Sequence, residues 1–258
     1  MTIDPENDEQ TPRQDRLPFL QLIPNMVTIL GLCAGLTAIR FVIFGRFELA
    51  AALIIFAALI DGLDGLLARR LNAASDIGAQ LDSLSDFLCF GVAPALLVFH
   101  MALGPEPGIG WIFVLTYASC ACLRLARFNV MADKEPDPSR PKTPHFTGVP
   151  APAGAMLALL PAFLSFQGVI DASVHPWLAD FTLAAAGALM VSRLPTISPK
   201  AITVPKDKQV WILLGAALLV GILLTRAWLL MIMLDLAYIA TLIWAARQWR
   251  KAARSPSA

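Results

Sequence analysis

Long apolar runs are the feature that most constrains how this chain can fold. Stretches of about 20 apolar residues recur along it, and a helix of that length spans a hydrocarbon core about 30 Å thick. With 57% hydrophobic and only 15% charged residues, the chain also lies outside the composition of soluble domains. The sequence therefore predicts a polytopic membrane protein of the all-α class.

We expect a bundle of about eight transmembrane helices. They are predicted near residues 22–43, 49–68, 80–102, 109–127, 149–169, 178–192, 209–225 and 227–246. The sixth stretch is short, and the last two are joined by almost no loop. The predicted organisation is a disordered cytosolic tail, a membrane domain, a C-terminal helix pair and a basic cytosolic tail, at residues 1–18, 19–208, 209–246 and 247–258.

The distribution of basic residues predicts the orientation of these helices. If the N-terminus is cytosolic, all but three of the 20 Lys and Arg residues fall in segments on the cytosolic side. The exceptions are Arg40, Arg46 and Arg226. Because cytoplasmic loops carry an excess of Lys and Arg, this bias favours both termini in the cytosol. The polar start of the chain lacks an apolar segment behind a basic region, so we expect a tail and not a cleaved signal peptide.

One stretch, "DGLDGLLARRLNAASDIGAQLDSLSD" at residues 61–86, is unusually acidic for such a chain. Asp61 and Asp64 are three residues apart and so share one face at the end of the second predicted helix. Asp82 and Asp86, four residues apart, share a face at the start of the third. A short turn joins the two helices. The spacing therefore predicts that four carboxylates converge without four matching cations nearby.

Such a cluster favours a metal and phosphate site. Carboxylates at a membrane are costly unless they are neutralised, and oxygen-only ligand sets suit Mg²⁺ or Mn²⁺. Two such ions form a clamp for phosphoryl-type transfer. Gly65 and Gly78 would allow a nucleotide or phosphate to approach the backbone closely, and Arg69 offers a fork for phosphate oxygens.

Two other interpretations of the acids are weaker. A solvated turn with ordinary charges does not explain why the carboxylates keep to single helix faces. A proton relay in an ion-coupled transporter predicts inverted repeats and a site near the middle of the membrane. The sequence contains no second copy of the acidic motif.

The same stretch reads D-x-x-D-G-x-x-A-R, eight residues, then G-x-x-x-D-x-x-x-D, and it resembles the signature of the CDP-alcohol phosphotransferases at every defined position. The resemblance implies a six-helix core with an added C-terminal pair. It also implies two metal ions held by Asp61, Asp64, Asp82 and Asp86, with Asp86 as the base that deprotonates the acceptor hydroxyl. The CDP group is expected near Gly65, Ala68, Arg69 and Gly78, and the family's first-helix residues suggest Asn25 and Thr28 as further nucleotide contacts.

Within the family, four further stretches are similar to bacterial phosphatidylserine synthases: "DSLSDFLCFGVAPA", "RLARFNV", "FTGVPAPAGA" and "LMVSRLPTISPK". This likeness implies transfer from CDP-diacylglycerol to L-serine, giving phosphatidylserine and CMP, by a multi-pass enzyme of the cell (inner) membrane whose site faces the cytoplasm. Nucleic acid is not an expected partner. Members of the family tend to be dimeric, so a homodimer is an expectation of the resemblance alone.

The acceptor is less clear from the residues. Candidate groups for an anionic or zwitterionic acceptor, or for the donor's phosphates, are Arg124, Arg127, Asn129, Lys142 and Arg193. Arginines at a membrane edge also bind lipid headgroups, and the sequence does not separate these roles. Glycerol 3-phosphate, inositol phosphate and choline stay open as acceptors, although no aromatic cage for choline accompanies the signature. Asp235, in the middle of the last predicted helix, is expected to be packed, hydrogen-bonded or protonated.

Overall fold

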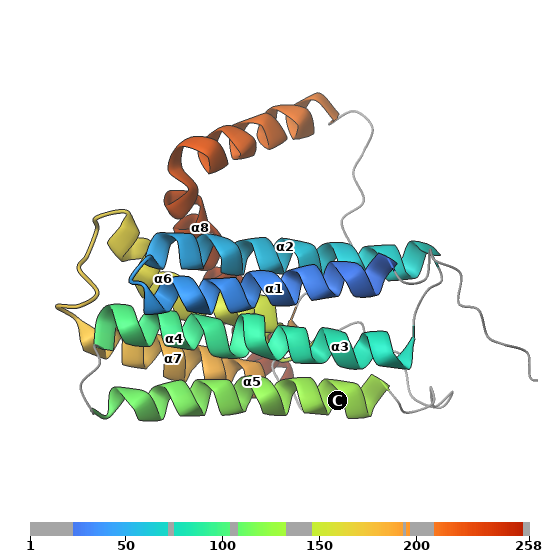
Figure 1. Cartoon of the computed structure of the whole chain (residues 1–258), viewed down its shortest axis with the longest axis horizontal. Coiled ribbons are helices and arrows are strands. Elements are labelled where there is room, and N and C mark those ends of the chain that lie inside the picture. Colours follow the sequence, from blue (N-terminus) through green and yellow to red (C-terminus); the bar gives the residue numbers. More distant parts are fainter. Residues whose placement is uncertain are drawn as a thin grey trace, which may run out of the picture.

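The computed structural model of the protein describes residues 23–71, 75–103, 108–132, 146–192, 195–196 and 209–254. These residues are almost entirely helical, which confirms the all-α prediction (Figure 1). In chain order the helices are α1 (Ile23–Ile43), α2 (Phe47–Leu71), α3 (Asp76–Asp86), the π-helical η2 (Phe87–Val92), α4 (Ala93–Val98), the π-helical η3 (Phe99–Leu103), α5 (Gly110–Ala132), α6 (Ala151–Phe166), α7 (Pro176–Val191) and α8 (Gln209–Arg254). Two short strands, β1 (Phe146–Thr147) and β2 (Pro195–Thr196), pair antiparallel.

Several helix ends differ from the predicted ones. The third predicted helix begins at Asp76 because Ser75 caps it, accepting a hydrogen bond from the Gly78 backbone N–H at 3.1 Å. It continues without a break from α3 through η3. The two last predicted helices are confirmed: α8 consists of two helices that meet at a kink at Arg226, whose dihedral angles, φ −144° and ψ 54°, are not helical. Residues 247–254, predicted as a tail, belong to the second of these helices.

Five helical stretches in the described residues are long and apolar enough to cross a membrane: Ile23–Ile43, Phe47–Leu67, Ile77–Ala102, Gly110–Met131 and Thr225–Gln248. α6 and α7 are apolar but shorter, with 16 residues each. These elements support a multi-pass membrane protein. The count of eight spans and the cytosolic termini stay predictions.

Close packing of α1 against the next helices holds the bundle together. In Figure 1, α1 and α2 run side by side, and α3 and α4 follow one another along the neighbouring position. A Cβ atom at Gly35 would lie 2.5 Å from Cys89 Sγ and 2.9 Å from Leu88 Cδ2. Only glycine therefore allows α1 to approach η2 this closely, as small residues do at helix contacts in membranes.

A buried tyrosine stabilises the π-helical segment that follows Asp86. In an α-helix, the carbonyl of Phe90 would accept a hydrogen bond from the N–H of residue 94, but that residue is Pro94 and has no N–H. Tyr117 of α5, which is fully buried, donates its hydroxyl to the Phe90 carbonyl at 2.7 Å. The hydroxyl thereby replaces the missing partner and ties α5 to η2.

We expect Tyr117→Phe to destabilise the protein, because it leaves the Phe90 carbonyl without this donor. A buried polar group left unpaired costs about 1–3 kcal/mol. Thermal unfolding in detergent should show a lower Tm than the wild type. Thr116→Val is the matched control, since the Thr116 hydroxyl is exposed and bonds only to the Ile112 carbonyl of its own helix. Equal Tm values for the two variants would contradict the role of Tyr117.

Candidate active site

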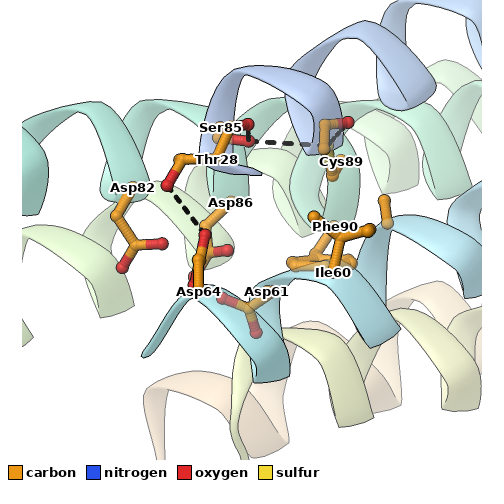
Figure 2. A pocket seen from close by; sticks show the side chains of 11 residues that line it. Thr28, Ile60, Asp61, Asp64, Asp82, Ser85, Asp86, Cys89 and Phe90 are labelled. Atoms are coloured by element: carbon orange, nitrogen blue, oxygen red, sulfur yellow. Dashed lines mark hydrogen bonds between the residues drawn. The ribbon is translucent and has the colours of Figure 1, made fainter. Parts of the chain in front are cut away.

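The four motif aspartates line one small pocket where α2 meets α3 (Figure 2). Asp61 and Asp64 come from α2, and Asp82 and Asp86 come from α3. Thr28 and Gly31 of α1, Ser85 of α3 and Cys89 of η2 also line it. Asp64 is buried, with 6% of its surface exposed, and the other three acids are partly buried. The arrangement therefore removes much of the water that would otherwise screen the repulsion between these carboxylates.

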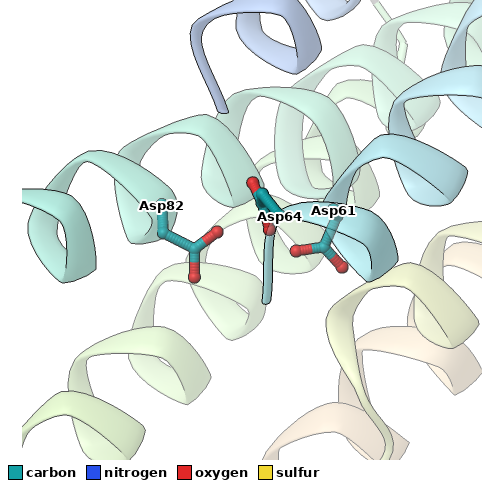
Figure 3. A group of neighbouring side chains, drawn as sticks. All are labelled: Asp61, Asp64 and Asp82. Carbon is teal, nitrogen blue, oxygen red and sulfur yellow. The ribbon is translucent and has the colours of Figure 1, made fainter. Parts of the chain in front are cut away.

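Three of the acids are arranged as a possible metal site. Asp61, Asp64 and Asp82 each offer a carboxylate oxygen, and these oxygens lie within 4.8 Å of one another (Figure 3). The donor set is all oxygen, which fits hard divalent ions such as Mg²⁺ or Mn²⁺. Asp86 is outside this group of three but lies in the same pocket and interacts with Asp61.

Thr28 contacts an acid in this structure. Its hydroxyl donates to Asp64 Oδ2 at 2.8 Å and also lies 3.1 Å from the Pro24 carbonyl of its own helix. The hydrogen bond fixes the orientation of the most buried of the four carboxylates. Sequence reasoning expected Thr28 at the nucleotide, and the bond to Asp64 places it one contact away from the metal-ligand candidates.

Gly78 and Asn25 lie against one another. A Cβ atom at Gly78 would lie 2.7 Å from Asn25 Oδ1 and 3.0 Å from Ser75 Oγ. A side chain at this position would therefore push the side chain of Asn25 aside. Both residues were predicted to lie at the nucleotide. Asn25 lies near the start of α1, and Gly78 lies near the start of α3, the helix that carries Asp82 and Asp86.

The three polar candidates on α5 have different surroundings. Arg124 interacts electrostatically with Asp86 and Asp61. Arg127 instead donates from Nη1 to the Val191 carbonyl at the end of α7, at 3.1 Å. Asn129 Oδ1 accepts a hydrogen bond from the Ser83 hydroxyl of α3 at 3.0 Å. Arg124 is thus the α5 candidate directed toward the acids, while the other two connect helix ends.

Some predicted residues cannot be placed by side chain. Lys142 and Arg193 lie outside the described residues. Ala68 and Arg69 belong to α2, but the structure describes only their backbone. Gly65 directly follows Asp64 in α2 and is partly exposed. Their proposed contacts with CDP or with the acceptor stay predictions.

Sequence reasoning missed Ser85 and Cys89. Ser85 Oγ lies 3.5 Å from the Thr28 carbonyl, and Cys89 Sγ donates to the Gly31 carbonyl at 3.3 Å. Both side chains connect the acidic helix to α1 beneath the carboxylates. Helical spacing could have identified them, because Ser85 and Cys89 follow Asp82 by one and two turns and so share its helix face.

Asp235 is buried, with 4% of its surface exposed. Its Oδ2 atom has no hydrogen-bond partner among the described residues. The expectation that Asp235 is packed is confirmed.

Comparison with known proteins identifies the family. The sequence model described as CDP-alcohol phosphatidyltransferase matches residues 21–192, which include all four aspartates. A CDP-diacylglycerol–serine O-phosphatidyltransferase of Mycobacterium bovis is 39% identical over 95% of this chain and 85% of its own length. The protein of the same name from Bacillus subtilis is 35% identical over 68% of this chain and 89% of its own length. With its full signature and a match over most of its length, the chain belongs to the CDP-alcohol phosphatidyltransferase family.

Proposed function

We propose that the chain is an integral membrane transferase that makes phosphatidylserine and CMP from CDP-diacylglycerol and L-serine. The observation that carries the proposal is the convergence of Asp61, Asp64, Asp82 and Asp86 in one pocket. The names of the relatives from Mycobacterium bovis and Bacillus subtilis support serine as the acceptor.

The four aspartates would hold two Mg²⁺ or Mn²⁺ ions. The close approach of three carboxylate oxygens supports this assignment, because such a group repels itself without cations. When bound, the ions neutralise the pyrophosphate of the donor and stabilise the charge that develops on the departing CMP. Thr28 would keep Asp64 in its ligating orientation through the hydrogen bond between them.

Asp86 would act as the general base. It accepts the proton of the serine hydroxyl, whose oxygen forms a bond to the lipid-bearing phosphorus. The bond between that phosphorus and the CMP oxygen breaks, and CMP leaves. Arg124, which interacts with Asp86, would lie on the acceptor side of the pocket. Asn25, Thr28, Gly65, Ala68, Arg69 and Gly78 remain the proposed surroundings of the nucleotide.

The proposed setting is the inner or cell membrane, with the site facing the cytoplasm. The bias of Lys and Arg residues supports that orientation. The acyl chains of the donor would then lie in the bilayer beside the exposed apolar side chains of the outer helices. The homodimer suggested by the family has no support in the structure of the single chain and stays a prediction.

We expect purified protein in detergent to release CMP from CDP-diacylglycerol when L-serine and Mg²⁺ or Mn²⁺ are present. Glycerol 3-phosphate, inositol phosphate and choline, each supplied alone, should give no release above background. EDTA should abolish release, because the acids then lack their cations, and added Mn²⁺ should restore it. Release with another acceptor would discard serine but keep the metal site; no release with any acceptor would overturn the proposal.

Asp86→Asn should remove the proposed base while keeping an oxygen at the position of the carboxylate. Because a general base contributes about 10²–10⁴-fold, we expect kcat to fall by at least about 100-fold. Metal-dependent binding of CDP-diacylglycerol should largely persist, since the three-oxygen group lacks Asp86. Asp82→Asn, one turn earlier, should lose that binding as well.

The control for both variants is Asp180→Asn on α7, which removes a carboxylate outside the pocket. It should turn over at the wild-type rate. Normal turnover by Asp86→Asn would remove Asp86 from the role of base.

A further inference from the structure

The second half of α8 packs into the bundle although it lies beyond the family match. We call residues 227–254 the C-terminal arm. Near its start lies Trp228, whose ring centroid is 5.9 Å from that of Phe163 and 4.9 Å from that of Phe166, both on α6. Ile232 and Leu242 of the arm are buried in the same core. The arm is therefore part of the packed structure and its inner face lies next to the catalytic bundle.

Tyr238 lies on this inner face, one turn before Leu242. Its side chain packs against the core, and its hydroxyl oxygen is buried. That hydroxyl has no hydrogen-bond partner among the described residues. A buried donor without a partner is unfavourable and uncommon, so its presence needs an explanation.

The other tyrosine of the chain provides the comparison. The sequence contains two tyrosines, and the hydroxyl of Tyr117 is also buried but donates to a carbonyl at 2.7 Å. Burial in this bundle therefore does not by itself leave a hydroxyl unpaired. Tyr238 is less buried than Tyr117, yet its hydroxyl oxygen is buried and lacks a hydrogen-bond partner among the described residues.

The neighbourhood of Tyr238 connects it to the active site. Tyr238 interacts electrostatically with Arg124, and Arg124 interacts with Asp86. Electrostatic interactions thus connect residues of α8, α5 and α3 in the order Tyr238, Arg124 and Asp86. By contrast, the interactions of Asp235, one turn earlier on the arm, do not include Arg124 among the described residues.

A guanidinium and a phenol hydroxyl are both hydrogen-bond donors, so a group bound by both is an acceptor, and the positive charge of the guanidinium favours an anion. The carboxylate of an amino acid fits this pair, since arginine binds carboxylates through two parallel hydrogen bonds. The phosphates of the lipid donor have the same charge. They are proposed to lie at the metal ions held by the aspartates, whereas the acceptor must place its hydroxyl beside Asp86.

We propose that Tyr238 of the C-terminal arm, together with Arg124, binds the carboxylate of the amino-acid acceptor. The inference rests on the proposed function, because it takes serine as the acceptor. It assigns α8 a part in acceptor specificity: an alcohol without a carboxylate leaves both donors unpaired and is disfavoured for that reason.

The test is steady-state kinetics of CMP release by Tyr238→Phe, which removes the hydroxyl and keeps the ring. We expect the KM for L-serine to rise about tenfold or more, with the KM for CDP-diacylglycerol within about twofold of the wild type. The ratio of kcat/KM for L-serine to that for L-serinamide, which lacks the carboxylate, should fall by a similar factor. Tm should not fall, because the lost hydroxyl has no partner within the described residues.

Tyr117→Phe is the matched control. It makes the same chemical change at a bonded hydroxyl, so it should lower Tm and leave the ratio of the two KM values unchanged. Arg124→Ala should shift the serine KM in the same direction as Tyr238→Phe.

Each outcome has a distinct meaning. A rise only in the KM for the lipid donor would assign the pair to the donor's phosphates and overturn the proposal. Equal changes in both KM values, or no change, would overturn it as well. If wild-type protein released no CMP with serine, the proposed function itself would fail, and this result is separate from any effect of the variants.

Discussion

Repulsion between four carboxylates held in one pocket is the constraint on which the rest of the structure depends. Asp61, Asp64, Asp82 and Asp86 lie on the adjoining ends of α2 and α3, where burial weakens the screening by water. Such a group repels itself unless protons or cations neutralise it, and its oxygen-only composition fits hard divalent ions. The hydrogen bond from Thr28 satisfies one oxygen of Asp64 and ties this carboxylate to α1.

The surrounding helices are built to hold these acids in place. Two glycines allow α1 to contact the helix that runs from α3 into η2. Gly35 of α1 lies against Cys89 of η2, and Gly78 of α3 lies beside Asn25 of α1. Just after Asp86, the helix changes to π-helical geometry, and Tyr117 of α5 satisfies a carbonyl there. π-helical turns often accompany functional sites, because they change the direction of the side chains around them. Here the change follows directly after the proposed base.

The inner face of the bundle extends beyond the part that matches the family model. The match ends at residue 192, yet the C-terminal arm packs on α6 through Trp228 and reaches Arg124 through Tyr238. Not every polar residue near a site faces it: Arg127 and Asn129 form hydrogen bonds with α7 and α3 instead.

Much of this protein follows from its sequence alone. Apolar length predicts the helices, and the spacing of Asp61, Asp64, Asp82 and Asp86 predicts their convergence, because both depend on local helical geometry and a short turn. Helix ends were less predictable, since the start of α3 depends on the hydrogen bond by which Ser75 caps it, and apolar patterns do not encode that bond. The break between the last two predicted helices, by contrast, is found as a kink at Arg226. The tertiary structure alone decided which distant polar residues meet. Arg124 and Arg127, one turn apart and alike in sequence, have different surroundings because α3 and α8 lie near one and the end of α7 near the other. Tyr238 came to interact with Arg124 in the same way, through packing between helices that are far apart in the chain.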